Sequence, residues 1–354
     1  GAVALAGWSV ATTVAVLLKP TDAAGDASLD QFTAPGQGDV VVDDPEAAPN
    51  VWDYHGPLNI LLLGLDETDC ADPVETTALR TDTIILVRVD PQTRRAAMLS
   101  IPRDLYVFIP GYGARKINTA HVLGDDPDDP GAGPRLLESV LYDNLQLAAQ
   151  RYVRSDFRSF EKLIDEGLGG LDIDLPPSAE DPTVSLVDTE YPDGLCGTMT
   201  IRFEPGRQHL TGAQALQYAR SRYSSSDFDR SRRQMEVLLA IKDEASSPVI
   251  LTRLPKLIPA LQRTVDTDLS ATEIFSLARV ATGVKREDVI SLRMDESIVY
   301  NDMLVIDGVP QAVLRVNQAA FDDLRGRFLG LVAPTPTPTA TGEAAAAPYA
   351  TATP

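Results

Sequence analysis

Histidine and cysteine, the side chains that most often serve as catalytic bases, nucleophiles or soft metal ligands, are scarce in this sequence. Its 354 residues include only 3 histidines and 2 cysteines. The histidines, His55, His121 and His209, do not stand at the spacing of metal ligands, so we interpret them as structural. There is no nucleophile elbow and no Cys–His catalytic pair, which argues against the common covalent hydrolases.

The two cysteines, Cys70 and Cys196, lie far apart in the sequence. Outside the cytoplasm two cysteines often pair, and neither has neighbours at the spacing of a metal site. We therefore favour a disulfide over two free thiols, although the sequence alone does not bring the two together.

Positive charge is also in short supply. Lysine and arginine together number 31 against 51 acidic residues, which gives a net charge of -20. A nucleic-acid-binding protein needs a broad basic surface, so this balance argues against one. An acidic protein that binds phosphate must instead concentrate its arginines in one place.

The two ends of the chain lack the features of a folded domain. Residues 1–18 contain no charged side chain, which predicts a membrane anchor, with a cleaved signal peptide as the alternative. Residues 19–53 follow as a flexible spacer rich in Asp, Ala, Gly and Pro. Residues 331–354 form a tail rich in Pro, Thr and Ala, which cannot bury a core. The catalytic domain is therefore expected over 54–330, on the extracellular side of a cell membrane that the chain crosses once.

The predicted domain has a mixed α/β fold, with helices packed around a mixed sheet. Continuous apolar runs predict strands at 58–64, 83–89 and 95–101, and the last two are joined as a hairpin by the turn at 90–93. An alternating pattern predicts a further strand at 171–175. Helical spacing and capping boxes predict helices over 134–150, 156–166, 211–222, 229–245 and from 271 onward, the second closed by Gly167. No repeat of fixed period is present.

Two aspartates flank the first two strands. Asp66 follows the first strand and Asp82, in the segment Arg80-Thr81-Asp82, precedes the second. Carboxylates at strand ends commonly hold a hard divalent cation through oxygen. The alternative is that Asp82 caps a turn while Asp66 is merely solvated.

Clustered arginines are the densest charge feature. Five arginines fall within fourteen residues, interrupted by Asp227 and Asp229: Arg220, Arg222, Arg230, Arg232 and Arg233. Guanidinium groups match phosphate oxygens bidentately, and several together suit a diphosphate. A solvated helix face with ion pairs four residues apart would explain Arg232 or Arg233, but it would not explain Arg220 and Arg222. Arg103 and Asp104, at a third strand end, add a further charged pair.

Four segments resemble, in order and spacing, the LytR–CpsA–Psr family. They are LNILLLGLD, LRTDTIILVRVDP, LSIPRDLYVFIPGYGARKINTAH and LTGAQALQYARSRYSSSDFDRSRRQ, and the resemblance covers about residues 58–245. The family arrangement, an N-terminal anchor followed by an extracellular catalytic domain, agrees with the apolar start of the chain. The family usually has Gly at the position of Asp229 and often an aromatic residue at that of His121. The family glycine implies a turn with left-handed backbone at this position. Asp tolerates left-handed backbone better than most residues, so we still expect the turn at Asp229.

The resemblance implies a phosphotransferase of the cell wall. Such an enzyme moves a phosphoryl-linked glycopolymer from a polyprenyl-pyrophosphate carrier onto peptidoglycan. It depends on Mg²⁺ (or Mn²⁺), forms no covalent enzyme intermediate, and has a possible pyrophosphatase side activity. The lipid tail would need an apolar tunnel, for which the helices of 134–164 are the candidates.

The same resemblance assigns residues. Asp66 and Asp82 are expected to hold the metal. The pyrophosphate-binding residues are expected to be Arg80, Arg103, Lys116, Arg220, Arg222, Arg230, Arg233 and Gln234. The catalytic residues are expected to be Arg103, Asp104 and Asp227, with either aspartate as the general base. Arg232 is expected to be a solvated neighbour.

Two alternatives belong to other classes of protein. One is a non-catalytic envelope protein that holds polyprenyl pyrophosphate or glycan with the same arginines. The other is a membrane-bound transcriptional attenuator. The net charge, the apolar start and the lack of a helix-turn-helix pattern weigh against nucleic-acid binding.

Overall fold

The computed structural model describes residues 56–66, 80–178, 181–192, 197–221, 227–247, 250, 258, 262 and 265–330. The predictions for the anchor, the spacer, the tail, the Cys70–Cys196 pair, His55 and Arg222 lie outside these residues, as do the side chains of Asp66, Arg80 and Asp227. The proposed division of the chain into domains stays a prediction. Within the described part, no helix is both long and apolar enough to cross a bilayer.

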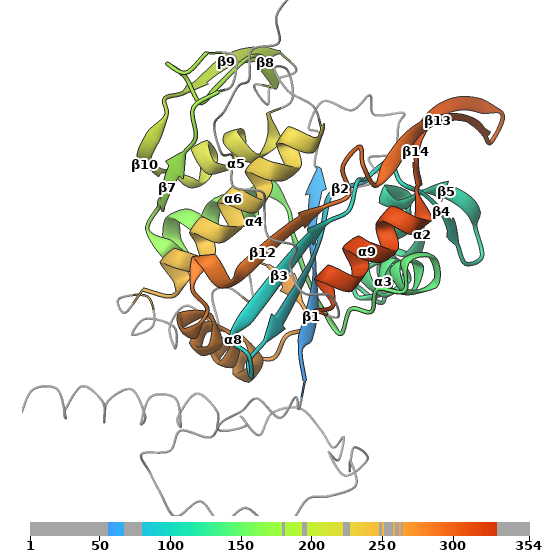
Figure 1. Cartoon of the computed structure of the whole chain (residues 1–354), viewed down its shortest axis with the longest axis horizontal. Coiled ribbons are helices and arrows are strands. Elements are labelled where there is room, and N and C mark those ends of the chain that lie inside the picture. The colour runs from blue at the N-terminus through green and yellow to red at the C-terminus, as the bar shows by residue number, and fades with distance from the viewer. Residues whose placement is uncertain are drawn as a thin grey trace, which may run out of the picture.

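A six-stranded mixed sheet forms the centre of the molecule (Figure 1). Its strand order is β11-β6-β1-β2-β3-β12. Strands β1, β2 and β3 are antiparallel neighbours, whereas β6 runs parallel to β1 and β12 runs parallel to β3. The bounds are Leu58–Asp66 for β1, Arg80–Asp90 for β2, Arg95–Ser100 for β3, Arg151–Ser155 for β6, Asp266–Thr267 for β11 and Val289–Arg293 for β12.

The predicted hairpin between β2 and β3 is confirmed. The Asp90 carboxylate accepts hydrogen bonds from the backbone N–H groups of Gln92 and Thr93 at 2.9 and 3.3 Å, which is the turn chemistry expected of Asp. Arg94 then takes the left-handed conformation, with φ of 53°, and the chain returns as β3.

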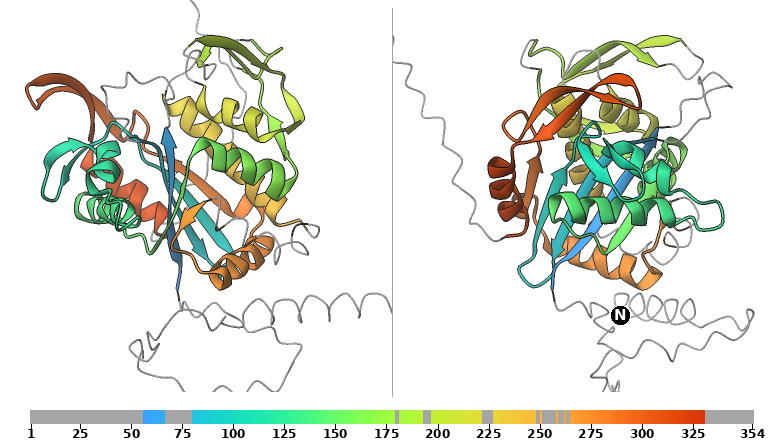
Figure 2. Two further views of the ribbon diagram at one scale, coloured as in Figure 1. Left: turned by 180° about the vertical axis from the view of Figure 1, so that it is seen from behind. Right: turned by 90° about the vertical axis from the view of Figure 1, so that its right-hand side faces the viewer.

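Helices cover both faces of this sheet, because successive side chains of its strands point to opposite sides. Leu61 and Leu63 of β1 enter the main core beneath α3 (Ala132–Leu145) and α9 (Gln318–Phe328), while Leu62 packs with Met235 of α6 (Asp227–Ala245). Figures 1 and 2 show α2 (Ala120–Gly124), α3 and α9 on one side of the sheet and α4, α5 and α6 on the other. The expected mixed α/β architecture is confirmed.

A second, smaller core lies beyond α6. It is closed by α4 (Phe157–Lys162), α5 (Gly212–Arg220) and two small ribbons: β7 (Leu171–Leu175) with β10 (Gly206–Leu210), and β8 (Leu186–Pro192) with β9 (Thr198–Phe203). The Thr211 capping box begins α5 as predicted. Gly212 lies so close to α4 that an added Cβ would be 2.4 Å from the Glu161 carbonyl oxygen. This contact sets how closely the start of α5 packs against α4.

Several helix boundaries differ from the prediction. Helix α3 ends at Leu145 rather than at 150, because Gln146 adopts the left-handed conformation with φ of 54°. The helix expected to close at Gly167 continues through a π-helical turn, Leu163–Leu168, and Gly169 supplies the left-handed residue. The left-handed turn expected at Asp229 was wrong, since Asp229 lies within α6, where a carboxylate in the first turn favours the helix dipole.

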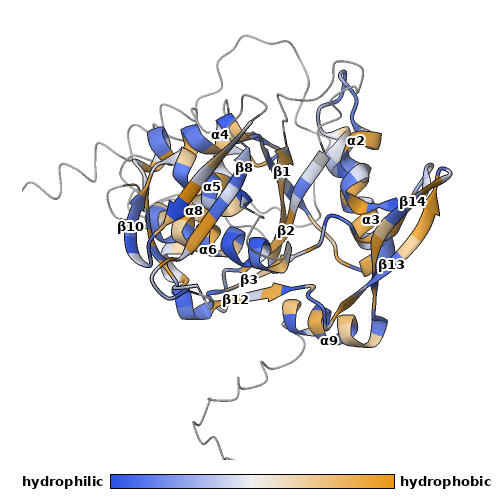
Figure 3. Ribbon diagram, turned by 90° about the horizontal axis from the view of Figure 1, so that it is seen from above, coloured by the Kyte–Doolittle hydropathy of each residue, from blue (hydrophilic) through white to orange (hydrophobic). Residues whose placement is uncertain are grey.

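Two hairpins project from the same side of the sheet. One comprises β4 (Tyr106–Ile109) and β5 (Gly113–Lys116), followed by the short helix η2 (Ile117–Thr119); the other comprises β13 (Val299–Ile306) and β14 (Val309–Val316). The Arg115 guanidinium pairs with the Asp307 carboxylate and so joins the two tips. Apolar stretches of β13 and β14 are visible in Figure 3. The remaining elements, α8 (Ala271–Gly283) and η4 (Arg286–Asp288), lead into β12.

Candidate functional site

A β-bulge in β2 places Asp82 in the site. Gly64 of β1 pairs with Thr83 and Leu65 pairs with Thr81, so Asp82 is the extra residue with no partner across the ladder. A bulge of this kind redirects side chains that regular pleating would send to opposite faces. As a result, Asp82 and Thr83 both line a cavity between the sheet and α6.

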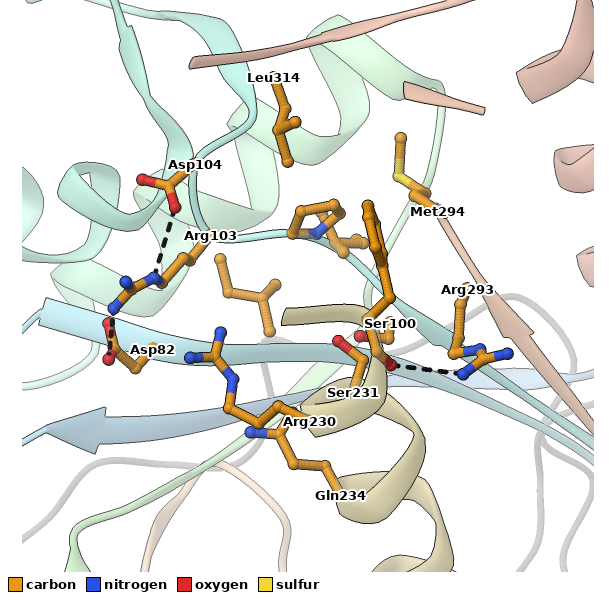
Figure 4. A pocket seen from close by; sticks show the side chains of 14 residues that line it. Asp82, Ser100, Arg103, Asp104, Arg230, Ser231, Gln234, Arg293, Met294 and Leu314 are labelled. Atoms are coloured by element: carbon orange, nitrogen blue, oxygen red, sulfur yellow. Dashed lines mark hydrogen bonds and ion pairs between the residues drawn. The ribbon is translucent and has the colours of Figure 1, made fainter. Parts of the chain in front are cut away.

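Arg103 reaches Asp82 from the loop that follows β3. Its Nη1 lies 2.7 Å from Asp82 Oδ2, and both side chains are mostly buried, with 23% and 17% exposed. Nε of the same guanidinium lies 3.5 Å from Asp104 Oδ2. Figure 4 shows this row of alternating charges, Asp82, Arg103 and Asp104, along one side of the site.

Lys116 closes the row at its outer end. Its ammonium donates to Asp104 Oδ1 at 2.8 Å from the end of β5. The Asp104 carboxylate thus lies between two cations: Arg103, which precedes β4, and Lys116, which ends β5. This arrangement fixes the orientation of the carboxylate toward the site.

Helix α6 brings a second set of polar side chains over the sheet (Figure 4). Gln234 Nε2 donates to Thr83 Oγ1 at 2.9 Å, which ties the helix to the bulge. Arg230, one turn earlier, has only 5% of its surface exposed and lines the same cavity as Asp82. A buried guanidinium carries a large desolvation cost, which nearby negative charge offsets.

The other two arginines of α6 have structural contacts. Arg233 Nε donates to the Tyr218 carbonyl at 3.1 Å and Nη2 donates to the Ser221 carbonyl at 2.5 Å, so it satisfies the last carbonyls of α5. Burial lowers the pKa of Arg233. Arg232 pairs with Glu236 four residues on at 2.6 Å, the ion pair expected of a solvated neighbour.

Arg220, at the end of α5, faces the cavity from the opposite wall. Its guanidinium carbon lies 3.7 Å from the centre of the Phe157 ring, and its Nη1 donates to the Tyr191 hydroxyl at 3.4 Å. Burial raises the pKa of Tyr191, whose hydroxyl therefore stays protonated. Stacking on an aromatic face holds a guanidinium plane in one orientation.

A large apolar cavity of about 640 Å³ lies between these polar groups. Aliphatic and aromatic side chains from the sheet and from α4, α5 and α6 supply most of its wall, among them Leu62, Val153, Phe160, Leu216 and Leu238. The prediction that the helices of 134–164 line an apolar tunnel is only partly correct. Leu163 and α4 line the cavity, whereas α3 packs in the main core on the other face of the sheet.

A second hollow, of about 30 Å³, adjoins the first. Asp82, Arg230 and Gln234 line both spaces. The small hollow also has Arg103 and Asp104 on its wall, together with Ser231 and Arg293, which were not predicted from the sequence. Arg293 ends β12, and its Nη1 donates to the Phe228 carbonyl at 3.3 Å.

The site around Asp82 offers few protein ligands for a metal ion. Among the residues that the structure describes, no three His, Cys, Asp or Glu side chains gather as a metal cluster. Asp82 offers a carboxylate oxygen, and the strand register sets Asp66 opposite Arg80, two residues before Asp82. One or two carboxylates fit Mg²⁺ that is held mainly by substrate phosphates, which is its usual mode at phosphoryl sites.

Two histidines can be placed. His121 is buried, and Arg154 Nη1 lies 2.9 Å from its Nε2. Burial, with the Arg154 charge beside it, lowers the pKa of His121 to about 4. His209 lies on the surface of β10, with Nδ1 2.6 Å from Asp172. Both rings contact side chains away from the cavity, in keeping with the structural interpretation.

The structure therefore gathers part of the predicted site. Asp82, Arg103, Asp104, Lys116, Arg230 and Gln234 form one cluster, and Arg220 faces the shared cavity. Arg233 lies instead against the end of α5. The assignments of substrate-binding, catalytic and metal-binding roles stay predictions.

A mixed α/β fold in which an apolar cavity opens onto clustered arginines and aspartates defines a protein suited to an amphiphilic ligand that carries phosphate. The model of the LytR_cpsA_psr family matches residues 28–325. The chain belongs to the LytR_cpsA_psr family, as its motifs predicted.

Named relatives agree with this membership. "Regulatory protein MsrR" of Staphylococcus aureus (strain Mu50 / ATCC 700699) is 32% identical over 250 residues, which cover 70% of this chain and 67% of MsrR. A polyisoprenyl-teichoic acid–peptidoglycan teichoic acid transferase, TagU of Oceanobacillus iheyensis, is 31% identical over 261 residues, 73% of each chain. The crystal structure of Bacillus subtilis TagV is similar with a TM-score of 0.60 and 26% identity, covering 78% of this chain and 96% of that one.

Proposed function

We propose that this protein transfers a phosphoryl-linked glycopolymer from a polyprenyl-pyrophosphate carrier onto peptidoglycan. The observation that carries the proposal is that Asp82, Arg230 and Gln234 line both the large apolar cavity and the small hollow. A lipid pyrophosphate has the same two parts in the same order. Its tail would bury apolar surface in the cavity while its phosphates meet the arginines.

The donor phosphates would lie between two sets of cations. Arg103 and Arg230 stand on the sheet and α6 side, and Arg220 stands on the α5 side. The first turns of α6 also face the site, and a helix N-terminus favours negative charge. The ion pair with Asp82 holds Arg103 in place before substrate arrives, so little reorganisation is needed as charge develops.

The transfer step needs no enzyme-linked intermediate. An acceptor hydroxyl oxygen attacks the sugar-proximal phosphorus, a new P–O bond forms, and the P–O bond to polyprenyl phosphate breaks, so polyprenyl phosphate leaves. Asp104, which Lys116 and Arg103 orient, accepts the hydroxyl proton. Asp227 is the other candidate base. Hydrolysis by water in place of the acceptor would give the pyrophosphatase side activity.

Mg²⁺ (or Mn²⁺) belongs to the proposal as a partner of the donor phosphates. Asp82 and Asp66 would hold it with phosphate oxygens, and when bound it would neutralise charge on the pyrophosphate. Residues 1–18 would anchor the chain in the cell membrane with the catalytic domain outside, where both the lipid carrier and peptidoglycan are accessible.

TagU is named as a transferase, whereas MsrR is named as a regulatory protein. The charged row of Asp82, Arg103 and Asp104 at the cavity favours the transferase, because mere binding of a lipid pyrophosphate does not need a carboxylate beside the phosphates. A non-catalytic binding protein remains the main alternative. A nucleic-acid-binding attenuator is disfavoured by the net charge of -20.

The test is transfer from a lipid-pyrophosphate glycan donor to peptidoglycan, with and without Mg²⁺, by the wild type and Arg103→Ala. We expect Mg²⁺-dependent transfer that falls by about 10²-fold in the variant, the usual effect of removing a group that stabilises developing charge. Arg115→Ala, which removes a half-buried arginine that is paired with Asp307 outside the cavity, is the matched control. Tight donor binding without turnover by the wild type would favour the non-catalytic alternative.

A further inference from the structure

In-line phosphoryl transfer imposes a direction on the acceptor. The attacking and leaving oxygens lie on opposite sides of phosphorus in the transition state. On the proposed function, the leaving group is polyprenyl phosphate, whose tail occupies the apolar cavity. The acceptor hydroxyl must therefore approach from the side of the phosphates that faces away from that cavity.

The strand order shows which side this is. The apolar cavity extends from Asp82 of β2 over β1 and β6, through Leu62 and Val153. The small hollow extends from the same Asp82 over β3 and β12, through Ser100 and Arg293. The two spaces thus extend from β2 in opposite directions across the sheet, and Asp82, Arg230 and Gln234 line both of them.

The small hollow has the chemistry of an acceptor site. The Asp104 carboxylate, the candidate base, lines it and does not line the apolar cavity. Its volume of about 30 Å³ has room for a hydroxyl group but not for a sugar ring. The ring would remain outside, against Leu314 of β14, whose backbone N–H donates to the Asp104 carbonyl at 2.9 Å.

Arg293 adds a positive charge to the wall of this hollow. The guanidinium is half-buried and donates to the Phe228 carbonyl at 3.3 Å. It has no carboxylate within ion-pair distance among the side chains that the structure describes, whereas Arg103, on the same wall, pairs with Asp82. A half-buried guanidinium without such a partner is suited to an anionic group on a ligand.

We propose that the hollow over β3 and β12 admits the acceptor hydroxyl, and that Arg293 positions the acceptor by binding a carboxylate that the acceptor glycan carries. The proposal rests on the proposed function and assigns the acceptor side of the same site. Arg293 does not contact the reacting phosphorus; it is a positioning residue. Leu314, at the outer rim, limits how the acceptor ring approaches.

The test compares acceptor and donor dependence in the wild type, Arg293→Ala and Arg293→Lys. The acceptors are a peptidoglycan glycan with free carboxylates and the same glycan with its carboxylates amidated. For Arg293→Ala we expect the KM for the carboxylate acceptor to rise roughly tenfold, the loss expected for one charge-assisted hydrogen bond, and to equal that for the amidated acceptor. Arg293→Lys should restore part of the preference. The donor Kd and the rate of donor hydrolysis by water should stay unchanged.

Two further variants separate this effect from misfolding. Leu314→Trp narrows the hollow from its rim and should lower transfer while the donor Kd is kept. Arg315→Ala, on the opposite face of the β13–β14 ribbon and paired with Asp302, is the matched control and should transfer normally. Thermal unfolding of each variant verifies the fold.

The outcomes are distinguishable. No turnover of donor by the wild type would reject the proposed function itself. Normal wild-type transfer with an unchanged acceptor KM in Arg293→Ala would overturn the acceptor-side assignment, and so would an equal loss of donor binding in Arg293→Ala and Leu314→Trp.

Discussion

Asp82 and Thr83 are consecutive residues of one strand, yet both face the cavity beneath α6. The bulge opposite Gly64 and Leu65 makes this possible. It lets Thr83 anchor Gln234 of α6 while Asp82 pairs with Arg103. The helix and the charged loop are thereby fixed to the same point on the sheet.

The charge of Asp82 is expected to matter more for activity than for folding. Asp82→Asn keeps the shape of the side chain but removes its ion pair with Arg103, so we expect transfer to fall by about 10²-fold. The pair is mostly buried but Arg103 keeps its contact with Asp104, so the free energy of unfolding should fall by about 1–2 kcal/mol. Initial rates across a Mg²⁺ titration and urea unfolding measure both quantities. Asp307→Asn, which also removes an arginine partner, serves as control. Full activity in Asp82→Asn would refute a role for this carboxylate.

Filling the apolar cavity should discriminate between donors by chain length. Leu216→Trp adds bulk to the cavity wall, so a long polyprenyl tail must give up buried surface. Displacing about two methylene groups costs about 1.6 kcal/mol, or roughly tenfold in Kd. Calorimetric titration with long-chain and short-chain pyrophosphates measures the difference. Tyr142→Trp, an exposed position on α3, is the control, and equal losses for both chain lengths would contradict a tail-binding cavity.

The contact of Gly212 with α4 predicts a stability defect. An alanine Cβ would meet the Glu161 carbonyl oxygen at 2.4 Å, so α5 must shift. We expect Gly212→Ala to lower the free energy of unfolding by about 1–3 kcal/mol, as for other overpacked sites. Because Arg220 ends the same helix, donor affinity should also fall. At Gly283 an added Cβ meets only Arg94 at 3.5 Å, so Gly283→Ala should show neither effect in urea unfolding.

His121 should make stability depend on pH in the acid range. Its pKa is lowered to about 4 in the folded protein, where it faces Arg154, Asp125 and Asp266. Between the unfolded value of about 6.5 and pH 4 the unfolded chain binds more protons, so stability is lost as the pH falls through this window. Relative to His121→Phe, the wild type should lose about 1–3 kcal/mol between pH 7 and pH 4. Parallel stability curves for the two proteins would contradict this.

Glu138 should make stability depend on pH in the opposite direction to His121. Burial, aided by the neighbouring Asp268, raises its pKa to about 7 in the folded protein. The folded state then binds more protons between the unfolded value of about 4.5 and pH 7, so this contribution to stability is lost as the pH rises. Glu138→Gln should therefore gain stability over the wild type with rising pH. Denaturant titrations at pH 4.5, 6 and 7.5 give the sign directly.

Half of the strands of the central sheet, and the capped helices, could be predicted from the sequence, because their signals are local. Continuous apolar runs gave β1 to β3, and the Thr211 and Ser270 capping boxes gave the starts of α5 and α8. The ends of α3 and α4 could not be placed in this way. They depend on a left-handed Gln146 and on a π-helical turn, neither of which has a compositional signature.

The site was predictable only as far as its motifs extend. Arg103, Asp104 and Asp82 lie in family motifs, but the bulge that brings Asp82 beside Arg103 depends on strand register. Arg293 ends β12, whose apolar sequence indicates a core element and gives no sign of a site residue. The parallel pairing of β12 with β3, which sets Arg293 opposite Ser100, brings it to the site. Arg233 was predicted to bind pyrophosphate because it belongs to the charged cluster. The sequence does not show that its side chain is buried against the end of α5.

The strand order also separates the chain segments that build the two sides of the site. The apolar cavity is lined by segments up to Val265, whereas the outer wall of the small hollow comes from Arg293, Met294 and Leu314 near the end of the fold. Mutations in β12 to β14 can therefore accumulate without altering the lipid side. On the proposed function, related chains could keep one lipid carrier while they diverge in the acceptor polymer, and a chimera that exchanges only 289–316 would test this separation.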